Sequence, residues 1–176
     1  MKMINTGDIL ETIRMVDDQN LDVRTITLSL SLLDCADADG RKAEKKVYDK
    51  VMKRAGKLVE VGEKLSAELG IPIVNKRVSV TPVSIVGAPS GNYVGLARVL
   101  DKAAMEIGID FLGGYSALVH KAMTNAERDF LMSVPEAISE TKKICSSINV
   151  ASTRSGINMD AVALMGRTVK AAAERT

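Results

Sequence analysis

Regular alternation of apolar and hydroxyl-bearing side chains is the feature of this sequence that most limits its fold. From residue 25 to residue 32 every second residue is Ile or Leu, and the residues between are Thr or Ser. Because successive side chains of a strand point to opposite faces, such a strand has one apolar face and one polar face. Parallel strands covered on both sides normally read as continuous apolar runs instead. We therefore expect a sheet that helices cover on one face only.

Two later stretches repeat this alternation in the same phase, with Lys76 interrupting the apolar side of the first of them. The residues expected to share the polar face with Thr25, Thr27, Ser29 and Ser31 are Asn75, Arg77, Ser79 and Thr81 in one stretch, and Cys145, Ser147, Asn149 and Thr153 in the other. Three strands are thus expected to contribute to a single polar surface.

Strand-like and helix-like stretches follow each other along the chain. The predicted strands cover 22–33, 71–81, 109–115 and 145–152, and the predicted helices cover 8–18, 41–69, 93–107, 125–144 and 158–175, with a break near Pro135. Alternation at these spacings is typical of parallel strands joined by crossover helices. The predicted fold class is α/β, with four mainly parallel strands and helices on the apolar face.

Size and composition limit the class of protein further. The 176 residues suit a single α/β domain over 1–176. The 24 Lys and Arg against 22 Asp and Glu, dispersed along the chain, argue against a nucleic-acid binder. The first residues lack the apolar core of a signal peptide, and no apolar run approaches the roughly 18 residues of a membrane span. We expect a soluble cytoplasmic protein with no membrane or nucleic-acid partner, whose two distant cysteines stay reduced.

Four strands are too few to close a barrel, so the polar face must meet solvent, a partner or the wet interior of a larger barrel. Open sheet edges also carry unpaired backbone groups. Symmetric association is the commonest way for identical chains to cover such surfaces. The expected partners are therefore a second copy of the chain, most simply in a dimer, or a separate polypeptide that supplies a C-terminal portion.

Several segments resemble a known family. They are LDVRTITLSLSLLDC at 21–35, GIPIVNKRVSVTP at 70–82, DFLGGYSA at 110–117 and CSSINVASTRSGINMDAV at 145–162. Together they are similar to the uncharacterised prokaryotic domain-of-unknown-function family seven-one-one. The resemblance implies part of a ten-stranded α/β barrel like that of the pyruvate formate-lyase-like glycyl radical enzymes. Members are usually more than twice as long, so the chain is expected to match their N-terminal portion. It has no glycyl radical segment, and we infer no radical chemistry.

A turn rich in hydroxyls follows the last predicted strand. Ser152, Thr153, Arg154 and Gly156 would place hydroxyls, a guanidinium and free backbone N–H groups before a helix that begins near Asn158. Anions bind at such turns. The alternative is an N-cap cluster in which Gly156 only permits the turn.

Arg77 is the strongest candidate for recognising a carboxylate or phosphate on the polar face, with Asn75 beside it in phase. An internal ion pair that holds the sheet together is the alternative. Cys145 and Cys35 both fall in phase with the polar faces of their strands, and a thiol beside hydroxyls and cations could react as a thiolate nucleophile. The alternative interpretation of Cys145 is that it is merely a small buried apolar residue. For Cys35 this structural interpretation is the favoured one.

Three further motifs favour structural roles. Gly113 and Gly114 lack the spacing of a dinucleotide fingerprint and are better explained by packing. The segment 34–40 superficially resembles a calcium loop, but the twelfth position counted from Cys35 is Lys46 instead of Glu, so the segment predicts a turn and helix cap. His120, the single histidine, is expected at the surface.

These residues predict a protein that holds an anionic small metabolite on its polar face, as an enzyme or as a non-catalytic binding or regulatory module. The candidate catalytic residue is Cys145, and the candidate ligand-binding residues are Asn75, Arg77, Ser147, Asn149, Ser152, Thr153, Arg154 and Gly156. No cofactor follows from these residue types, and no metal site is predicted.

Overall fold

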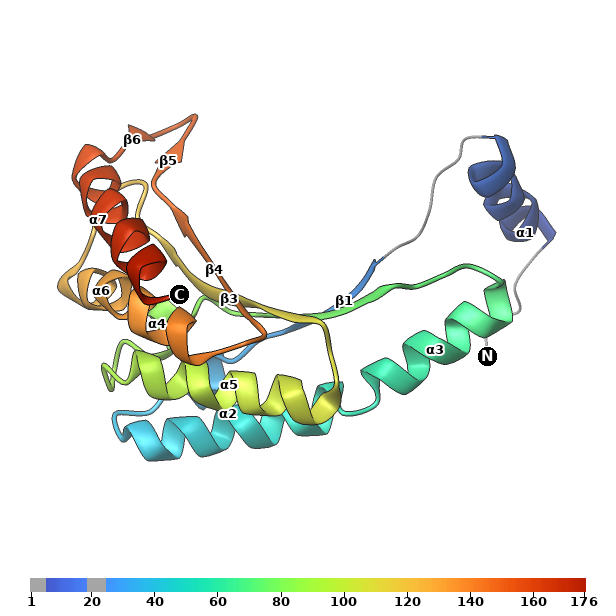
Figure 1. The fold of residues 1–176 in the computed structure, drawn as a ribbon, viewed down its shortest axis with the longest axis horizontal. Coiled ribbons are helices and arrows are strands. Elements are labelled where there is room, and N and C mark those ends of the chain that lie inside the picture. Colours follow the sequence, from blue (N-terminus) through green and yellow to red (C-terminus); the bar gives the residue numbers. More distant parts are fainter. Residues whose placement is uncertain (1–5, 19–24) are drawn as a thin grey trace.

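The computed structural model describes residues 6–18 and 25–176 (Figure 1). At its centre is a four-stranded sheet in the order β1-β2-β3-β4, with every neighbouring pair parallel. The strands are β1 (Thr25–Leu30), β2 (Asn75–Val80), β3 (Phe111–Leu118) and β4 (Ile144–Asn149). The predicted α/β class with four parallel strands is confirmed. The first residues of the predicted first strand, 22–24, lie outside the described residues.

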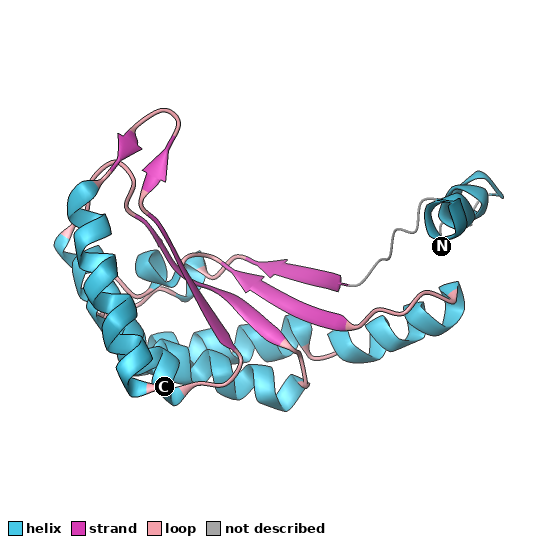
Figure 2. Cartoon of the chain, turned by 45° about the horizontal axis from the view of Figure 1, so that its top comes forward, coloured by secondary structure: helices cyan, strands magenta, loops and turns pink. Residues whose placement is uncertain are grey.

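Helices cover one face of this sheet and leave the other bare (Figure 2). The helices that follow β1 along the chain are α2 (Gly40–Ala55), α3 (Leu58–Leu69), α4 (Val83–Val86), α5 (Tyr93–Ile107), α6 (Asn125–Glu140) and α7 (Met159–Arg175). The remaining elements are α1 (Thr6–Ile13), the π-helical η1 (Arg14–Asp18), the 3₁₀-helical η2 (Leu33–Cys35) and a small hairpin of β5 (Ala151–Ser152) with β6 (Gly156–Ile157). The described part of the chain contains no helix long and apolar enough to cross a membrane.

Polar residues just outside the helices determine where several of them begin. Asp39 accepts hydrogen bonds from the backbone N–H groups of Arg41 and Lys42 at the start of α2. Thr124 and Glu127 form a reciprocal capping box at the start of α6. Asn158 caps α7 by accepting a hydrogen bond from the backbone N–H of Ala161, and the predicted start of this helix near Asn158 is confirmed. These side chains satisfy backbone donors that have no partner within the helix.

The prediction of one helix over 41–69 is wrong, because the segment forms α2 and α3. The backbone leaves helical geometry at Lys57 (φ −106°, ψ 8°), directly after Gly56. Glycine loses more conformational freedom in a helix than any other residue and contributes no side-chain packing. The apolar spacing nevertheless continues across the break, so periodicity alone cannot reveal it.

The predicted break at Pro135 is also wrong, since α6 continues through it to Glu140. Proline removes one backbone donor and crowds the preceding turn. Here its ring is buried together with Val134 and Ala137, on a helix that packs against α7. Burial of this apolar surface offsets the local cost. Residues 141–143 then connect the helix to β4, so Ile144 belongs to the strand.

The core lies between the apolar face of the sheet and the helices. Phe130 is fully buried at its centre, with ring centroids 5.3 Å from Tyr93 and 4.7 Å from Tyr115. Tyr93 donates from its hydroxyl to the carbonyl oxygen of Ala126 at 2.8 Å, and the Tyr115 and Ser133 hydroxyls share a hydrogen bond of 2.8 Å. Burial raises the pKa of Tyr115 to about 12. These aromatic residues join α5 and α6 to β3.

A β-bulge interrupts β3 at Gly114. The register with β4 shifts between Gly113 and Tyr115, and Gly114 has a φ of +116°. A Cβ at this position would lie 2.5 Å from the carbonyl oxygen of Val80. The packing explanation predicted for these glycines is confirmed at Gly114, where the two backbones approach too closely for a side chain. The bulge lets Gly113 face the open side of the sheet while Tyr115 enters the core.

Candidate functional site

The bare face of the sheet has the polar character predicted from the alternation. In β1, Thr27 and Ser29 are exposed while their neighbours are less so, and in β2 Arg77 is exposed between half-buried Lys76 and buried Val78. In β4 the exposed residues are Cys145, Ser147 and Asn149. We call this surface the open face.

Strand register arranges these residues in rows across the open face. Ser29 pairs with Ser79, Ser79 with Gly113, and Gly113 with Cys145. The adjacent row joins Thr27 to Arg77 and Arg77 to Phe111. Side chains that share a row stand close together on one face of the sheet. The first row consists of small residues, and the second carries a cation and an aromatic ring.

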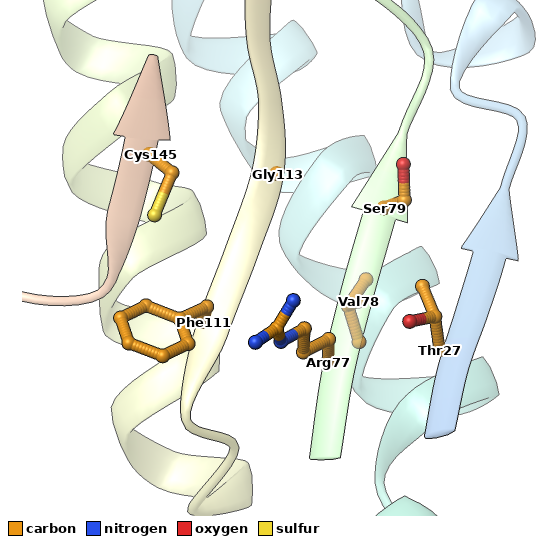
Figure 3. Close-up of a pocket in the computed structure, with 7 residues that line it drawn as sticks. All are labelled: Thr27, Arg77, Val78, Ser79, Phe111, Gly113 and Cys145. Atoms are coloured by element: carbon orange, nitrogen blue, oxygen red, sulfur yellow. The ribbon is translucent and has the colours of Figure 1, made fainter. Parts of the chain in front are cut away.

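These two rows form a concavity of about 430 Å³. Its lining residues are Thr27, Arg77, Val78, Ser79, Phe111, Gly113 and Cys145 (Figure 3). They come from all four strands of the sheet, and none of them is acidic. A Cβ at Gly113 would meet no atom within 4 Å, so the missing side chain contributes open space. We call this hollow the Arg77 concavity.

Arg77 is held by an aromatic contact and by no acidic residue of the described chain. Its guanidinium carbon lies 5.5 Å from the centroid of the Phe111 ring. A cation over an aromatic face is attracted by the ring quadrupole, which restricts the side chain without neutralising its charge. The guanidinium forms no ion pair with any described residue. As far as the described residues are concerned, its donors can therefore meet a ligand.

The two cysteines have different environments. Cys145 is exposed in the Arg77 concavity, whereas Cys35 is buried, and both are free thiols. Burial raises the pKa of the Cys35 thiol, and the nearby carboxylate of Asp34 adds to this effect. The interpretation of Cys35 as a small buried residue is confirmed. Its predicted position on the polar face of a strand is wrong, because the chain turns into η2 after Ser31 and Leu32 and carries Cys35 into the core.

The remaining predicted residues of β2 and β4 lie outside the Arg77 concavity. Asn75 is half-buried at the first position of β2, opposite Thr25. Ser147 and Asn149 line a neighbouring hollow of about 450 Å³ together with Ser116 and residues 150–151. Asn149 also accepts a hydrogen bond of 3.2 Å from the backbone N–H of Ala151 through its side-chain oxygen. The structure thus places these two residues farther along β4 than Cys145.

The predicted turn from the last strand to the last helix is a hairpin. The fourth strand ends at Asn149 instead of Ser152, and Ser152 pairs antiparallel with Gly156. The two ends of the turn are joined because the backbone N–H of Ser155 donates to Ser152 Oγ at 3.1 Å. Gly156 has a φ of +74°, which favours glycine. The N-cap is Asn158, so the hydroxyl cluster does not cap the helix.

Ser152, Thr153 and Arg154 line a third hollow, of about 450 Å³, with His120, Lys121 and Ser155. The structure therefore brings Arg77 and Cys145 together, keeps Ser147 with Asn149, and groups the hairpin residues separately. Sequence reasoning missed Phe111, His120 and Lys121 as lining residues. Phe111 is the register partner of Arg77, but register across parallel strands is not visible in the sequence.

The acidic segment at 34–40 serves as a turn and helix cap, as predicted. Asp37 accepts a hydrogen bond of 3.0 Å from the backbone N–H of Asp39, which itself caps α2. Lys46 bonds to Asp37 and lowers the pKa of that carboxyl. Lys50 pairs with Asp34 in the same way. In the described residues, no group of three or more His, Cys, Asp or Glu could hold a metal ion.

Comparison with known proteins gives a consistent family match. Residues 14–176 match the family described as "Uncharacterised ACR (DUF711)". A UPF0210 protein of Ligilactobacillus salivarius is 55% identical over 173 residues, which are 97% of this chain and 39% of that protein. UPF0210 proteins of Desulforamulus reducens and Clostridium botulinum are 53% and 55% identical over 176 and 175 residues. The chain spans 39% of the length of each of these relatives.

Proposed function

The chain belongs to the DUF711 family of uncharacterised proteins, and we propose that it binds an anionic small metabolite in the Arg77 concavity. The observation that carries this proposal is the Arg77 guanidinium, which lies over Phe111 and pairs with no acidic group of the described residues. A guanidinium presents a planar fork of donors that matches a carboxylate or a phosphate. The two free thiols agree with a cytoplasmic location, which is part of the proposal.

The surroundings of Arg77 suit a small organic anion. Thr27 and Ser79 supply hydroxyl donors from the neighbouring register positions, and Gly113 leaves space above the strand. Phe111 offers apolar surface for the body of the ligand. Ligand sites commonly combine apolar lining with a few polar groups that fix orientation.

Two candidate functions differ in the role of Cys145. In an enzyme, its thiolate would attack a ligand held by Arg77. No histidine or carboxylate lines the concavity to take the thiol proton, and this favours a non-catalytic binding module. Comparison of Cys145→Ala with the wild type separates the two functions. If the wild type converts the ligand and the variant binds it with the same affinity but no longer converts it, the protein is an enzyme. If the wild type binds the ligand without converting it, the protein is a binding module.

We also propose that the sheet forms part of the wall of a larger α/β barrel, similar to the ten-stranded barrel of pyruvate formate-lyase-like enzymes. The strands follow each other in chain order, and helices cover one face only. Continued addition of strands in this manner curves a sheet toward closure, with the bare face inside. The relatives are long enough to supply further strands, since the chain spans 39% of their length.

The sheet edges support a proposal about association. β1 and β4 are edge strands of the four-stranded sheet. We propose that a second copy of the chain, or a separate polypeptide equivalent to the rest of the longer relatives, completes this surface. Sedimentation of the purified 176-residue chain at micromolar concentration is expected to show a dimer, and a monomer would contradict the proposal of a second copy.

Binding of small anions tests the proposed function. A panel of carboxylates and phosphates is screened for an increase in the melting temperature of the 176-residue chain, and calorimetry then measures the affinity of each anion found. Arg77→Ala is expected to weaken binding at least about tenfold, because the ligand loses its charge-assisted hydrogen bonds. Arg128→Ala, which removes another exposed arginine, should leave the affinity unchanged. Equal affinity in wild type and Arg77→Ala would show that the site is wrongly placed.

A further inference from the structure

The geometry points to a second binding site, for a phosphate group, where the β5–β6 hairpin meets the end of β3. The hollow there is lined by His120, Lys121, Ser152, Thr153, Arg154 and Ser155 and has a volume of about 450 Å³. Its residues follow β3 and β4 directly, at the carboxyl ends of parallel strands. Ligands of open α/β sheets bind preferentially at this edge. The inference stands independently of the proposed function.

Hydrogen bonds connect the two segments that form this hollow. Ser155 Oγ donates to the carbonyl oxygen of His120 at 3.5 Å. Asn158 Nδ2 donates to the carbonyl oxygen of Val119 at 2.7 Å, and the Asn158 backbone N–H donates to Val150 at 2.9 Å. The hairpin is therefore attached to the end of β3, and Arg154 and Lys121 line one hollow although they are far apart in sequence.

The charge of this hollow is positive and uncompensated. Lys121 and Arg154 are both exposed, and neither forms an ion pair with a described residue. None of the lining residues is acidic. By contrast, Lys46 and Lys50 on α2 are each paired with an aspartate. Two free cations in one hollow repel each other, and an anion between them would relieve this repulsion.

His120 carries an unpaired polar atom beside this hollow. Its Nδ1 is inaccessible to solvent and has no hydrogen-bond partner among the described residues. Buried polar atoms are nearly always paired, and an unpaired one requires an explanation such as a bound group. The expectation that His120 is a surface residue holds only in part, because the residue is half-buried.

The donors fit a phosphate better than a planar carboxylate. An ammonium, a guanidinium and the hydroxyl of Thr153 come from two separate segments, so they can approach a tetrahedral group from several directions. The hollow contains no Phe, Tyr or Trp side chain on which a base could stack, which disfavours nucleic acid. The site is also separate from the Arg77 concavity, because Cys145 and Asn149 alone are about 13 Å apart along β4.

Titration of the ¹⁵N-labelled 176-residue chain with inorganic phosphate tests the site, with amide shifts read residue by residue. We expect the largest shifts at residues 120–121 and 152–155. The double variant Lys121→Gln, Arg154→Gln should weaken phosphate binding at residues 120–121 and 152–155 at least about tenfold, whereas Arg128→Gln should leave it unchanged. Both substituted residues are exposed, so their replacement should leave the fold intact. Shifts confined to residues 77 and 145, or equal affinity at residues 120–121 and 152–155 in the double variant, would overturn the inference.

A second titration with glycerol phosphate distinguishes the source of the phosphate group. Tighter binding of the ester with the same pattern of shifts would support a phosphorylated metabolite, and tighter binding of inorganic phosphate would support the free anion. Absence of shifts at 120–121 and 152–155 with both compounds would overturn the inference.

Discussion

Gly114→Ala is expected to unfold the chain or to lower its free energy of unfolding by at least about 3 kcal/mol. The backbone at Gly114 has a φ of +116°, a conformation that residues with a Cβ rarely adopt. The new methyl group would also lie 2.5 Å from the Val80 carbonyl oxygen and 2.6 Å from Val80 Cγ2. Backbone atoms of a central strand cannot move away without breaking the sheet. Urea denaturation followed by circular dichroism measures the loss.

The neighbouring glycine is the matched control. A Cβ at Gly113 would meet no atom within 4 Å, and the backbone there does not require a positive φ. Gly113→Ala should therefore change the free energy of unfolding by less than about 1 kcal/mol. If Gly114→Ala is as stable as Gly113→Ala, the bulge does not depend on the missing side chain.

Phe130→Ala is expected to cost about 3–5 kcal/mol of stability, because it opens a large cavity in the middle of the core. The ring is fully buried and contacts Tyr93 and Tyr115, so its removal also loses two aromatic contacts. Chemical denaturation of the variant gives the difference directly.

The other phenylalanine of the chain serves as its control. Phe111 is 43% exposed on the open face, so Phe111→Ala should cost much less stability than Phe130→Ala. Similar losses for the two variants would mean that the core is not centred where the structure places it.

The strands and their polar face could be predicted because burial imposes the alternation directly. Thr27 and Ser29 face away from the helices, and any chain with this pattern must either solvate or cover them. The bulge at Gly114 could not be predicted, since it depends on how closely the Val80 backbone approaches. The helix break after Gly56 was missed because the apolar spacing of α2 and α3 is continuous across it.

The sequence predicted individual residues of the candidate site, but it did not predict which of them lie together. The phase of each strand placed Arg77 and Cys145 on one face, but it could not show how far they lie from Ser152 and Arg154. That separation follows from the end of β4 at Asn149 and the hairpin beyond it. His120 and Lys121 were missed as lining residues because tertiary hydrogen bonds bring the hairpin against them.

Alkylation of Cys145 by two matched reagents tests most directly whether the Arg77 concavity attracts anions. Iodoacetate and iodoacetamide have similar size and react at the same carbon, but only iodoacetate is charged. Cys35 is buried, so the exposed Cys145 is the thiol expected to react, and mass spectrometry of the labelled peptide confirms the position. This measurement needs no knowledge of the natural ligand.

The quantity compared between variants is the rate of alkylation by iodoacetate divided by the rate with iodoacetamide. Arg77→Ala is predicted to lower this ratio about two- to fourfold, the effect of removing one positive charge two strand spacings, or roughly 10 Å, away across a partly solvated surface. Arg128→Ala should leave the ratio at its wild-type value. A ratio that is the same in wild type and Arg77→Ala would contradict the proposal that Arg77 recruits an anion beside Cys145.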